Sequence, residues 1–126
     1  MPQAPTPLLV LAVDEDDQDR SATARVLRQH GFTVLEAASG FQAVTSSLTA
    51  GRPVDVLVTD ISMPDLEDGL RLARVLRRRY PQLPVLVTTG EVPARGPEGD
   101  DRLMYLAKPY RPQDLIRCMR LLMRAP

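Results

Sequence analysis

The segment LLVLAVDEDD occupies residues 8–17 and contains the pattern that decides the fold. Its first part, Leu8 to Val13, is a continuous apolar run of strand length, which is expected of a parallel strand that helices cover on both faces. Acidic residues follow directly, from Asp14 to Asp17. The segment therefore predicts a buried strand that ends abruptly in carboxylates.

The same pattern recurs farther along the chain. Val54 to Thr59 is again apolar and β-branched, and it ends in Asp60. Three more segments predict strands, and they cover residues 33–37, 85–88 and 104–107. The second of these continues into Thr89 and the third into Lys108. Polar residues therefore follow four of the five predicted strands.

The segment after the acidic group has the periodicity of an amphipathic helix that extends to His30. Its pattern places Ala22, Val26 and Leu27 toward the core. Gly31 stands where a helix commonly stops. Any one of the acids before this helix, Asp14, Asp16 or Asp17, could serve as its cap instead of contributing to a site.

A second helix is expected between the second and third strands. Ser39 is its candidate cap, and Gly51 follows its end. Phe41, Val44 and Leu48 recur at helical spacing and form the predicted apolar stripe of this helix.

Two further helices are predicted in the second half of the chain. The first covers Leu70 to Arg79 and the second begins at Pro112, a residue favoured in the first turn of a helix. Both combine an inward apolar face with an outward row of arginines, which we interpret as solvated faces. The inward residues are Leu72, Val75, Leu76, Leu115, Cys118, Met119 and Leu122, and the outward ones are Arg71, Arg74, Arg78, Arg117, Arg120 and Arg124.

Strands and helices alternate through the chain, which predicts an α/β fold with a five-stranded, doubly wound parallel sheet. One crossover departs from the pattern. Residues 90–99 are rich in glycine and proline, so a full helix there is not expected, and the fourth helix should be shortened or irregular.

Length and composition limit the classes of function. The chain has 126 residues and a net charge of +0, so it is the size of one domain and has no overall field to attract nucleic acid. We expect residues 1–7 to form a flexible arm and residues 8–124 to form the domain. The early apolar run is too short to span a membrane, and a single cysteine is compatible with a reducing compartment. These features favour a cytoplasmic protein.

The carboxyl ends of parallel strands lie at the same edge of a sheet, where ligands commonly bind. Carboxylates that meet there repel one another and need a cation, and oxygen ligands suit Mg²⁺. The residues expected to converge at this edge are Asp14, Glu15, Asp60, Thr89 and Lys108.

Such a site suits phosphoryl transfer, which needs an aligned nucleophile and positive charge on the transferred group. Asp60 can be the nucleophile, since carboxylates form aspartyl-phosphates. Lys108 is the only lysine in a chain with 15 arginines. An ammonium on a long, flexible stem reaches a single oxygen in a crowded site better than a planar guanidinium does.

These motifs resemble the receiver domain of bacterial two-component response regulators. The resemblance rests on the acidic group after LLVLAV, on DISMP at residues 60–64, on PVLVTTG at 84–90 and on YLAKPY at 105–110. It implies a flavodoxin-like sheet with strand order 2-1-3-4-5, and phosphorylation by a histidine kinase or a histidine phosphotransfer protein. The chain could be a stand-alone regulator or the receiver of a hybrid histidine kinase.

The resemblance also implies individual roles. Asp60 is the phosphoacceptor, and Mg²⁺ is held by Asp14, Glu15, Asp60 and the main-chain carbonyl of Ser62. Thr89 and Lys108 contact the phosphoryl group, and Tyr105 is the aromatic switch that follows Thr89 inward. Lys108 precedes a proline whose peptide bond is often cis in the family.

Three features depart from the family pattern. Glu15 is one methylene longer than aspartate, DLED at residues 65–68 gives the loop after Asp60 an extra residue, and residues 90–99 lack the composition of a helix. The last departure makes dimerisation through the usual face of the family doubtful.

Other functions agree less well with these residues than a phosphoacceptor does. A receiver-shaped interaction module that is never phosphorylated remains an alternative. A phosphatase of the haloacid dehalogenase kind would need an acid two residues after Asp60, where this chain has Ser62. A nucleotide or flavin site is disfavoured because no glycine-rich turn follows the first strand.

Overall fold

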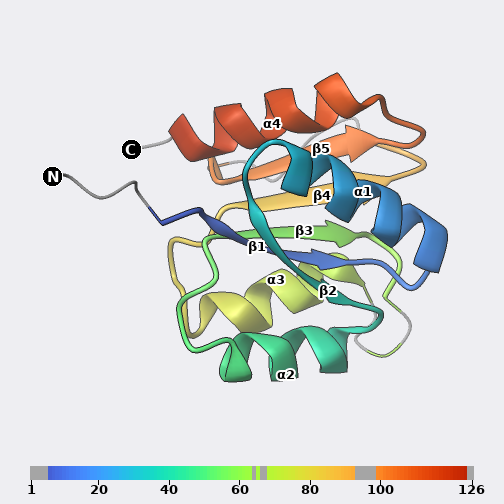
Figure 1. Ribbon diagram of the computed structural model, residues 1–126. Coiled ribbons are helices and arrows are strands. Elements are labelled where there is room, and N and C mark those ends of the chain that lie inside the picture. Colours follow the sequence, from blue (N-terminus) through green and yellow to red (C-terminus); the bar gives the residue numbers. More distant parts are fainter. Residues whose placement is uncertain (1–5, 64, 66–67, 93–98, 125–126) are drawn as a thin grey trace, which may run out of the picture.

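The computed structural model of the chain describes residues 6–63, 65, 68–92 and 99–124. Within them the chain forms a five-stranded parallel sheet with the order β2-β1-β3-β4-β5, which confirms the predicted flavodoxin-like topology. Figure 1 shows this sheet between two layers of helices. The strand order reverses at β1, which lies between β2 and β3.

Among the described residues, strands and helices alternate as the sequence predicts, and β4 is followed by β5. The strands are β1 (Leu9–Val13), β2 (Thr33–Ala37), β3 (Val56–Asp60), β4 (Val85–Thr89) and β5 (Leu103–Ala107). The helices are α1 (Asp17–Gln29), α2 (Gly40–Thr49), α3 (Gly69–Arg77) and α4 (Pro112–Arg124).

The apolar strands bury both of their faces, so the sheet divides the core into two halves. On one side α1 and α4 pack against alternate strand residues such as Val10, Val58 and Leu86. On the other side α2 and α3 pack against the residues between them, such as Leu11 and Leu57 (Figure 1). This two-sided burial explains why the strands are apolar without alternation.

Three helices begin at side-chain caps. The carboxylate of Asp16 accepts a hydrogen bond from the Asp19 N–H at 2.8 Å, and Ser39 and Asp68 act in the same way at α2 and α3. Gly31 follows α1 with a φ of 90°, a conformation that favours glycine. The predicted cap at Ser39 and the predicted stop at Gly31 are therefore confirmed.

The predicted inward faces of α3 and α4 are also correct in most positions. Every residue expected inward on α4 is buried, and Ile116 joins them. On α3, Leu72 and Leu76 are buried, Val75 is half-buried, and Ala73 completes the face.

The predicted faces of α1 and α2 are wrong in part. On α1, Leu27 is buried and Val26 is half-buried against the core as expected, but Ala22 is exposed and α1 buries Thr23 and Ala24. Phe41 and Leu48, which the periodicity assigned to an inward stripe, are 75% and 58% exposed. Helix α2 instead buries its small residues Gly40, Ala43 and Ser47. Val44 is half-buried against the core as expected, so the error concerns Phe41 and Leu48.

Some predictions fall on residues outside those described. Residues 90–92 and 99–102 contain no helix, in agreement with a shortened crossover, but residues 93–98 are outside the described ranges. The same holds for residues 1–5 of the predicted arm, and for residues 64, 66 and 67 beside the extra loop residue. No helix among the described residues is long and apolar enough to cross a membrane.

Candidate functional site

The polar residues that follow the strands gather at one edge of the sheet. Asp14 follows β1, Asp60 ends β3, Thr89 ends β4 and Lys108 follows β5. These strands are neighbours and parallel, so their carboxyl ends lie side by side. The predicted convergence of these four residues is therefore present in the backbone.

The Lys108 ammonium joins the acids of this edge. Its Nζ lies 3.2 Å from Asp14 Oδ2 and 3.4 Å from Asp60 Oδ1. A third carboxylate, that of Asp19 in the first turn of α1, lies 3.6 Å away. Lys108 and the Asp14 and Asp60 side chains are 24%, 11% and 13% exposed, so their charges interact in a partly dehydrated site.

The electrostatics reflect this burial. Burial raises the pKa of the Asp14 carboxyl above its ordinary value, although the Asp16 N–H and the Lys108 ammonium both oppose the rise. Burial also disfavours the charged form of Lys108, but the Asp14, Asp60 and Asp19 carboxylates outweigh it and raise the pKa of this lysine. Lys108 is thus held in its charged form. Its charge and the Asp16 N–H offset only part of the free energy that burial of the Asp14 carboxylate costs.

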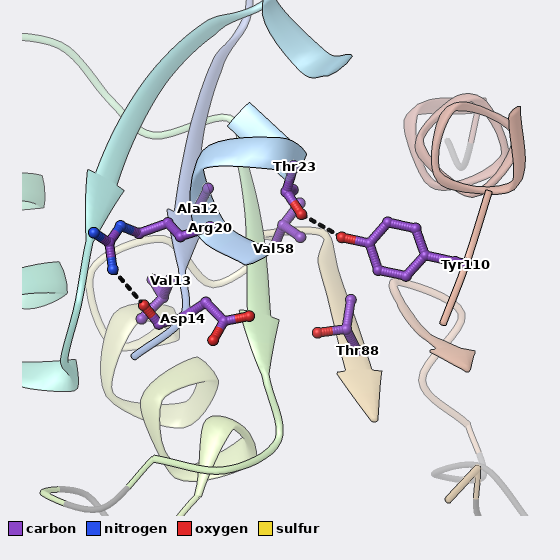
Figure 2. A pocket seen from close by; sticks show the side chains of 8 residues that line it. All are labelled: Ala12, Val13, Asp14, Arg20, Thr23, Val58, Thr88 and Tyr110. Atoms are coloured by element: carbon purple, nitrogen blue, oxygen red, sulfur yellow. Dashed lines mark hydrogen bonds between the residues drawn. The ribbon is translucent and has the colours of Figure 1, made fainter. Parts of the chain in front are cut away.

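Hydrogen bonds orient Asp14 from two sides. Its Oδ1 accepts the Asp16 N–H at 2.9 Å, and its main-chain carbonyl accepts a hydrogen bond from the Arg20 guanidinium at 2.7 Å (Figure 2). These bonds leave Oδ2 directed to Lys108.

Thr89 reaches the site through its main chain. The Lys108 N–H donates to the Thr89 carbonyl at 2.8 Å, which continues the pairing of β4 with β5. The Thr89 hydroxyl is buried and bonds to the main chain of Glu91, donating to its carbonyl at 3.1 Å and accepting its N–H at 3.2 Å. In this conformation the hydroxyl holds the start of the loop after β4.

The remaining predicted residues lie near this edge. Glu15 follows Asp14 and is exposed, and Ser62 is exposed in the loop after β3, where it forms an isolated bridge with Asp68. Tyr105 is half-buried on β5 and packs against the half of the core to which α2 and α3 contribute. The peptide bond between Lys108 and Pro109 is cis, as the resemblance implied.

The donors at this edge fit a hard cation such as Mg²⁺. Asp14 and Asp60 face the same positively charged nitrogen, so the space between them already accommodates a cation. In the described part of the chain no three His, Cys, Asp or Glu side chains form a ready-made cage. Mg²⁺ does not need one, because it keeps several waters and is commonly held by one or two carboxylates.

Sequence reasoning missed four residues around the site. Asp19 contacts Lys108, Arg20 supports Asp14, and the Tyr110 hydroxyl shares a short hydrogen bond with Thr23 on α1. The sequence pattern that could have identified Asp19 is its position in the first turn of a helix that begins at this edge. Thr23 and Tyr110 are 87 positions apart in the chain, and only the packing of α1 beside the loop after β5 brings them together.

The arrangement combines a nucleophilic carboxylate with a fixed positive charge. The Asp60 carboxylate lies at the end of β3. The Lys108 ammonium beside it can also pair with an anion that enters the site. These are the elements that phosphoryl transfer to a carboxylate requires.

The chain is similar to known proteins over most of its length. Residues 10–120 match the response regulator receiver domain family. The chain is 36% identical over 104 residues to the sensor kinase CckA of Brucella abortus, which covers 80% of this chain and 11% of that protein. It is 37% identical over 121 residues to the response regulator MprA of Mycobacterium ulcerans, covering 91% of this chain and 50% of that protein.

A solved structure shows the same likeness. The receiver domain of the hybrid histidine kinase CckA superposes with a TM-score of 0.73 at 33% identity, covering 90% of this chain and 98% of that one. The chain therefore spans half or less of the two curated relatives, but nearly all of the solved CckA receiver domain.

Proposed function

Because this chain belongs to the response regulator receiver domain family, we propose that it accepts a phosphoryl group on Asp60 and passes the change to a partner surface. A receiver domain is a module of two-component signalling and not an enzyme. The donor is the phosphohistidine of a histidine kinase or of a histidine phosphotransfer protein. The proposed signalling unit is residues 8–124, with residues 1–7 as an arm, and it acts in the cytoplasm.

The observation that carries the proposal is the single lysine shared by Asp14 and Asp60. Its Nζ lies within 3.4 Å of both carboxylates, although it stands 48 positions from Asp60 in the chain and 94 from Asp14. A cation that served only stability could be an arginine, the choice of this sequence at every other basic position. A phosphoryl site needs a compact charge that can exchange partners.

The transfer forms one bond and breaks another. An Asp60 carboxylate oxygen attacks phosphorus, the phosphorus–nitrogen bond of phosphohistidine breaks, and the leaving imidazole takes a proton. During this step Lys108 moves its charge from the free carboxylates to an oxygen of the arriving group. The Thr89 hydroxyl exchanges its bonds to Glu91 for a second phosphoryl oxygen.

The residues that would hold Mg²⁺ are Asp14, Glu15, Asp60 and the carbonyl of Ser62. When bound, the ion neutralises the acids and stabilises the negative charge that develops on the phosphoryl oxygens. Arg20 and the Asp16 N–H keep Asp14 directed into the site for this purpose.

The proposed output begins at Thr89. Once its hydroxyl turns to the phosphoryl group, the loop after β4 loses the two bonds that now hold Glu91. Tyr105 lies on the adjacent strand opposite Val87 and is only half-buried, so its ring has room to follow. The surface of β5 and the loop before it would change as a result.

Intact-mass measurement tests the acceptor directly. Incubation with Mg²⁺ and acetyl phosphate should add the mass of one phosphoryl group, and Asp60→Asn should abolish the addition. Asp101→Asn is a matched control. Asp101 is exposed and lies outside the site, so its substitution removes the same charge without changing the site.

The alternative is a receiver-shaped interaction module that is not phosphorylated. It is supported if the unmodified chain gains no mass from acetyl phosphate while its circular dichroism remains that of a folded α/β protein. A gain that persists in Asp60→Asn would place the modification elsewhere and contradict the proposed acceptor.

A further inference from the structure

A hydrogen bond joins α1 to the loop that carries Lys108. The Tyr110 hydroxyl bonds to the Thr23 hydroxyl, and Figure 2 shows the two side chains directed toward each other across the space between their elements. Thr23 is buried and Tyr110 is half-buried. Neither residue belongs to the phosphoacceptor set described above.

The spacing of the contacts indicates what this bond positions. Asp19 and Thr23 are four residues apart on α1, so they lie one above the other on the same face of the helix. Lys108 and Tyr110 are two residues apart in the loop after β5, on either side of Pro109. Asp19 pairs with Lys108 and Thr23 with Tyr110, so the two contacts fix the register of the loop against α1.

Apart from the carboxylates that Lys108 meets in the site, the other contacts of this loop are with β4 and with the start of α4. Lys108 is held through its N–H by β4, and Arg111 pairs with Asp114 in the first turn of α4. Among the described residues between Lys108 and α4, Tyr110 is the one whose side chain bonds to α1. The exposed Lys108–Asp19 pair is the other link, and solvent weakens it because the Asp19 side chain is 57% exposed.

The same bond separates two spaces. On the inner side lies a small cavity of about 10 Å³, lined by Asp14, Arg20 and Thr88 (Figure 2). On the outer side lies an open groove of about 470 Å³ between α1 and the lysine loop. Thr23 and Tyr110 line both spaces, so their hydrogen bond lies between the outer groove and the small cavity beside Asp14.

We propose that Tyr110, through its hydrogen bond to Thr23, is a positioning residue that holds Lys108 against Asp14 and Asp60 and closes the back of the site. Its effect on phosphoryl uptake rests on the function proposed above, whereas its effect on the lysine does not. Loss of the bond would let the loop shift along α1, and Lys108 would then spend less time between the two carboxylates.

The environment of the Lys108 side chain can be measured directly by NMR. Lys108 is the only lysine, so protein labelled with ¹⁵N at the lysine ζ position gives a single side-chain nitrogen signal by NMR. Tyr110→Phe and Thr23→Val each remove one hydroxyl and keep nearly the same shape. At fixed pH, both should move the Lys108 signal in the same direction, and the double variant should move it no farther than either single one.

Tyr80→Phe is the matched control, because Tyr80 is also half-buried and hydrogen-bonded through its hydroxyl, but to Arg79 after α3. It should leave the Lys108 signal unchanged. In the acetyl phosphate assay, Tyr110→Phe and Thr23→Val should slow phosphoryl uptake about three- to tenfold, as expected for the loss of one hydrogen bond.

An unchanged Lys108 signal in both variants would overturn the proposal, and so would shifts that add up in the double variant. If one variant fails to fold, the other decides, since each removes the same bond. If the unmodified chain takes up no phosphate, the proposed function fails, but the nitrogen signal still tests the positioning of Lys108.

Discussion

At the scale of single residues, Lys108 explains how two acids can share a buried edge. Asp14 and Asp60 would repel each other without a cation, and Lys108 lies 3.2 and 3.4 Å from them. Its long stem reaches the space between the carboxylates from β5, and its three donors can divide among several oxygens. The presence of a single lysine among 15 arginines thus has a geometric explanation.

Lys108→Arg should impair phosphoryl uptake although it keeps the charge. A guanidinium is planar and larger, and it would form a bidentate pair with one acid instead of sharing a point charge with the incoming group. We expect the rate of mass gain with acetyl phosphate to fall by about tenfold or more. Arg117→Lys on the exposed face of α4 is the reciprocal control and should have no effect.

A normal rate of uptake in Lys108→Arg would mean that any cation suffices at this position. Our account of the single lysine would then be wrong, while Asp60 could remain the acceptor.

Gly69 is a second residue whose identity the site requires. A Cβ added to it would lie 2.3 Å from the carbonyl oxygen of Asp60, closer than packed atoms approach. Gly69→Ala should therefore push the start of α3 away from the acceptor strand and lower the free energy of unfolding by about 1–3 kcal/mol. Urea denaturation measures the loss. Gly90→Ala is the comparison, because an added Cβ there meets nothing within 4 Å and should be nearly neutral.

At the scale of elements, periodicity predicted the helices better than their faces. It placed the inner face of α4 correctly because that helix buries large apolar residues against the sheet, among them Leu115, Met119 and Leu122. It failed on α2, where the helix buries Gly40, Ala43 and Ser47. Hydrophobic spacing identifies the largest apolar side chains, whereas α2 buries small residues and leaves Phe41 and Leu48 exposed.

The ion pair between Arg77 and Asp100 ties α3 to the turn before β5. Arg77 Nη1 lies 2.6 Å from Asp100 Oδ2, and both side chains are less than a third exposed, at 23% and 27%. The same guanidinium donates to the Leu83 and Arg102 carbonyls, at 3.0 and 3.2 Å. It therefore anchors the described turn before β5 to the end of α3.

Stability should depend on pH through this pair. The hydrogen bond from Arg77 holds the pKa of the Asp100 carboxyl below its ordinary value of 3.8. A lowered pKa in the folded state stabilises the fold above the ordinary pKa, and this stabilisation is lost as the pH falls through the lower folded value. Asp100→Asn should therefore reduce the free energy of unfolding by about 1 kcal/mol at neutral pH, and by progressively less below pH 3.8.

Urea denaturation at neutral and at acid pH measures this difference. Asp101→Asn, at the exposed neighbouring acid, is the control and should show no such dependence. An equal loss for Asp100→Asn at both pH values would show that the ion pair is not its source.

At the scale of the whole molecule, the topology assembles the site. The apolar strands that end in polar residues predicted the meeting of Asp14, Asp60, Thr89 and Lys108 at one edge, and the resemblance to receiver domains implied the strand order. The neighbours of these residues could not be predicted in the same way. The contact between Thr23 and Tyr110 depends on how α1 packs beside a loop, and no periodic pattern in the sequence encodes that distance.

The charge balance of the site also acts on the stability of the whole fold. Asp14 is buried at a cost that raises its pKa, and Lys108 compensates only part of that cost. A divalent cation that binds the folded chain, and not the unfolded one, should raise the free energy of unfolding by about 1.4 kcal/mol at ten times its dissociation constant. Thermal denaturation with Mg²⁺ and with EDTA should therefore show a higher midpoint in Mg²⁺.

Asp14→Asn should remove most of this shift, because the amide lacks the charge that attracts the ion while it can still accept the Asp16 N–H. Asp17→Asn, on the exposed first turn of α1, should keep the shift. A shift of equal size in Asp14→Asn would place the binding of Mg²⁺ elsewhere on the molecule. No shift in the unmodified chain would mean that Lys108 alone neutralises this edge, so that phosphoryl uptake would have to proceed without the metal.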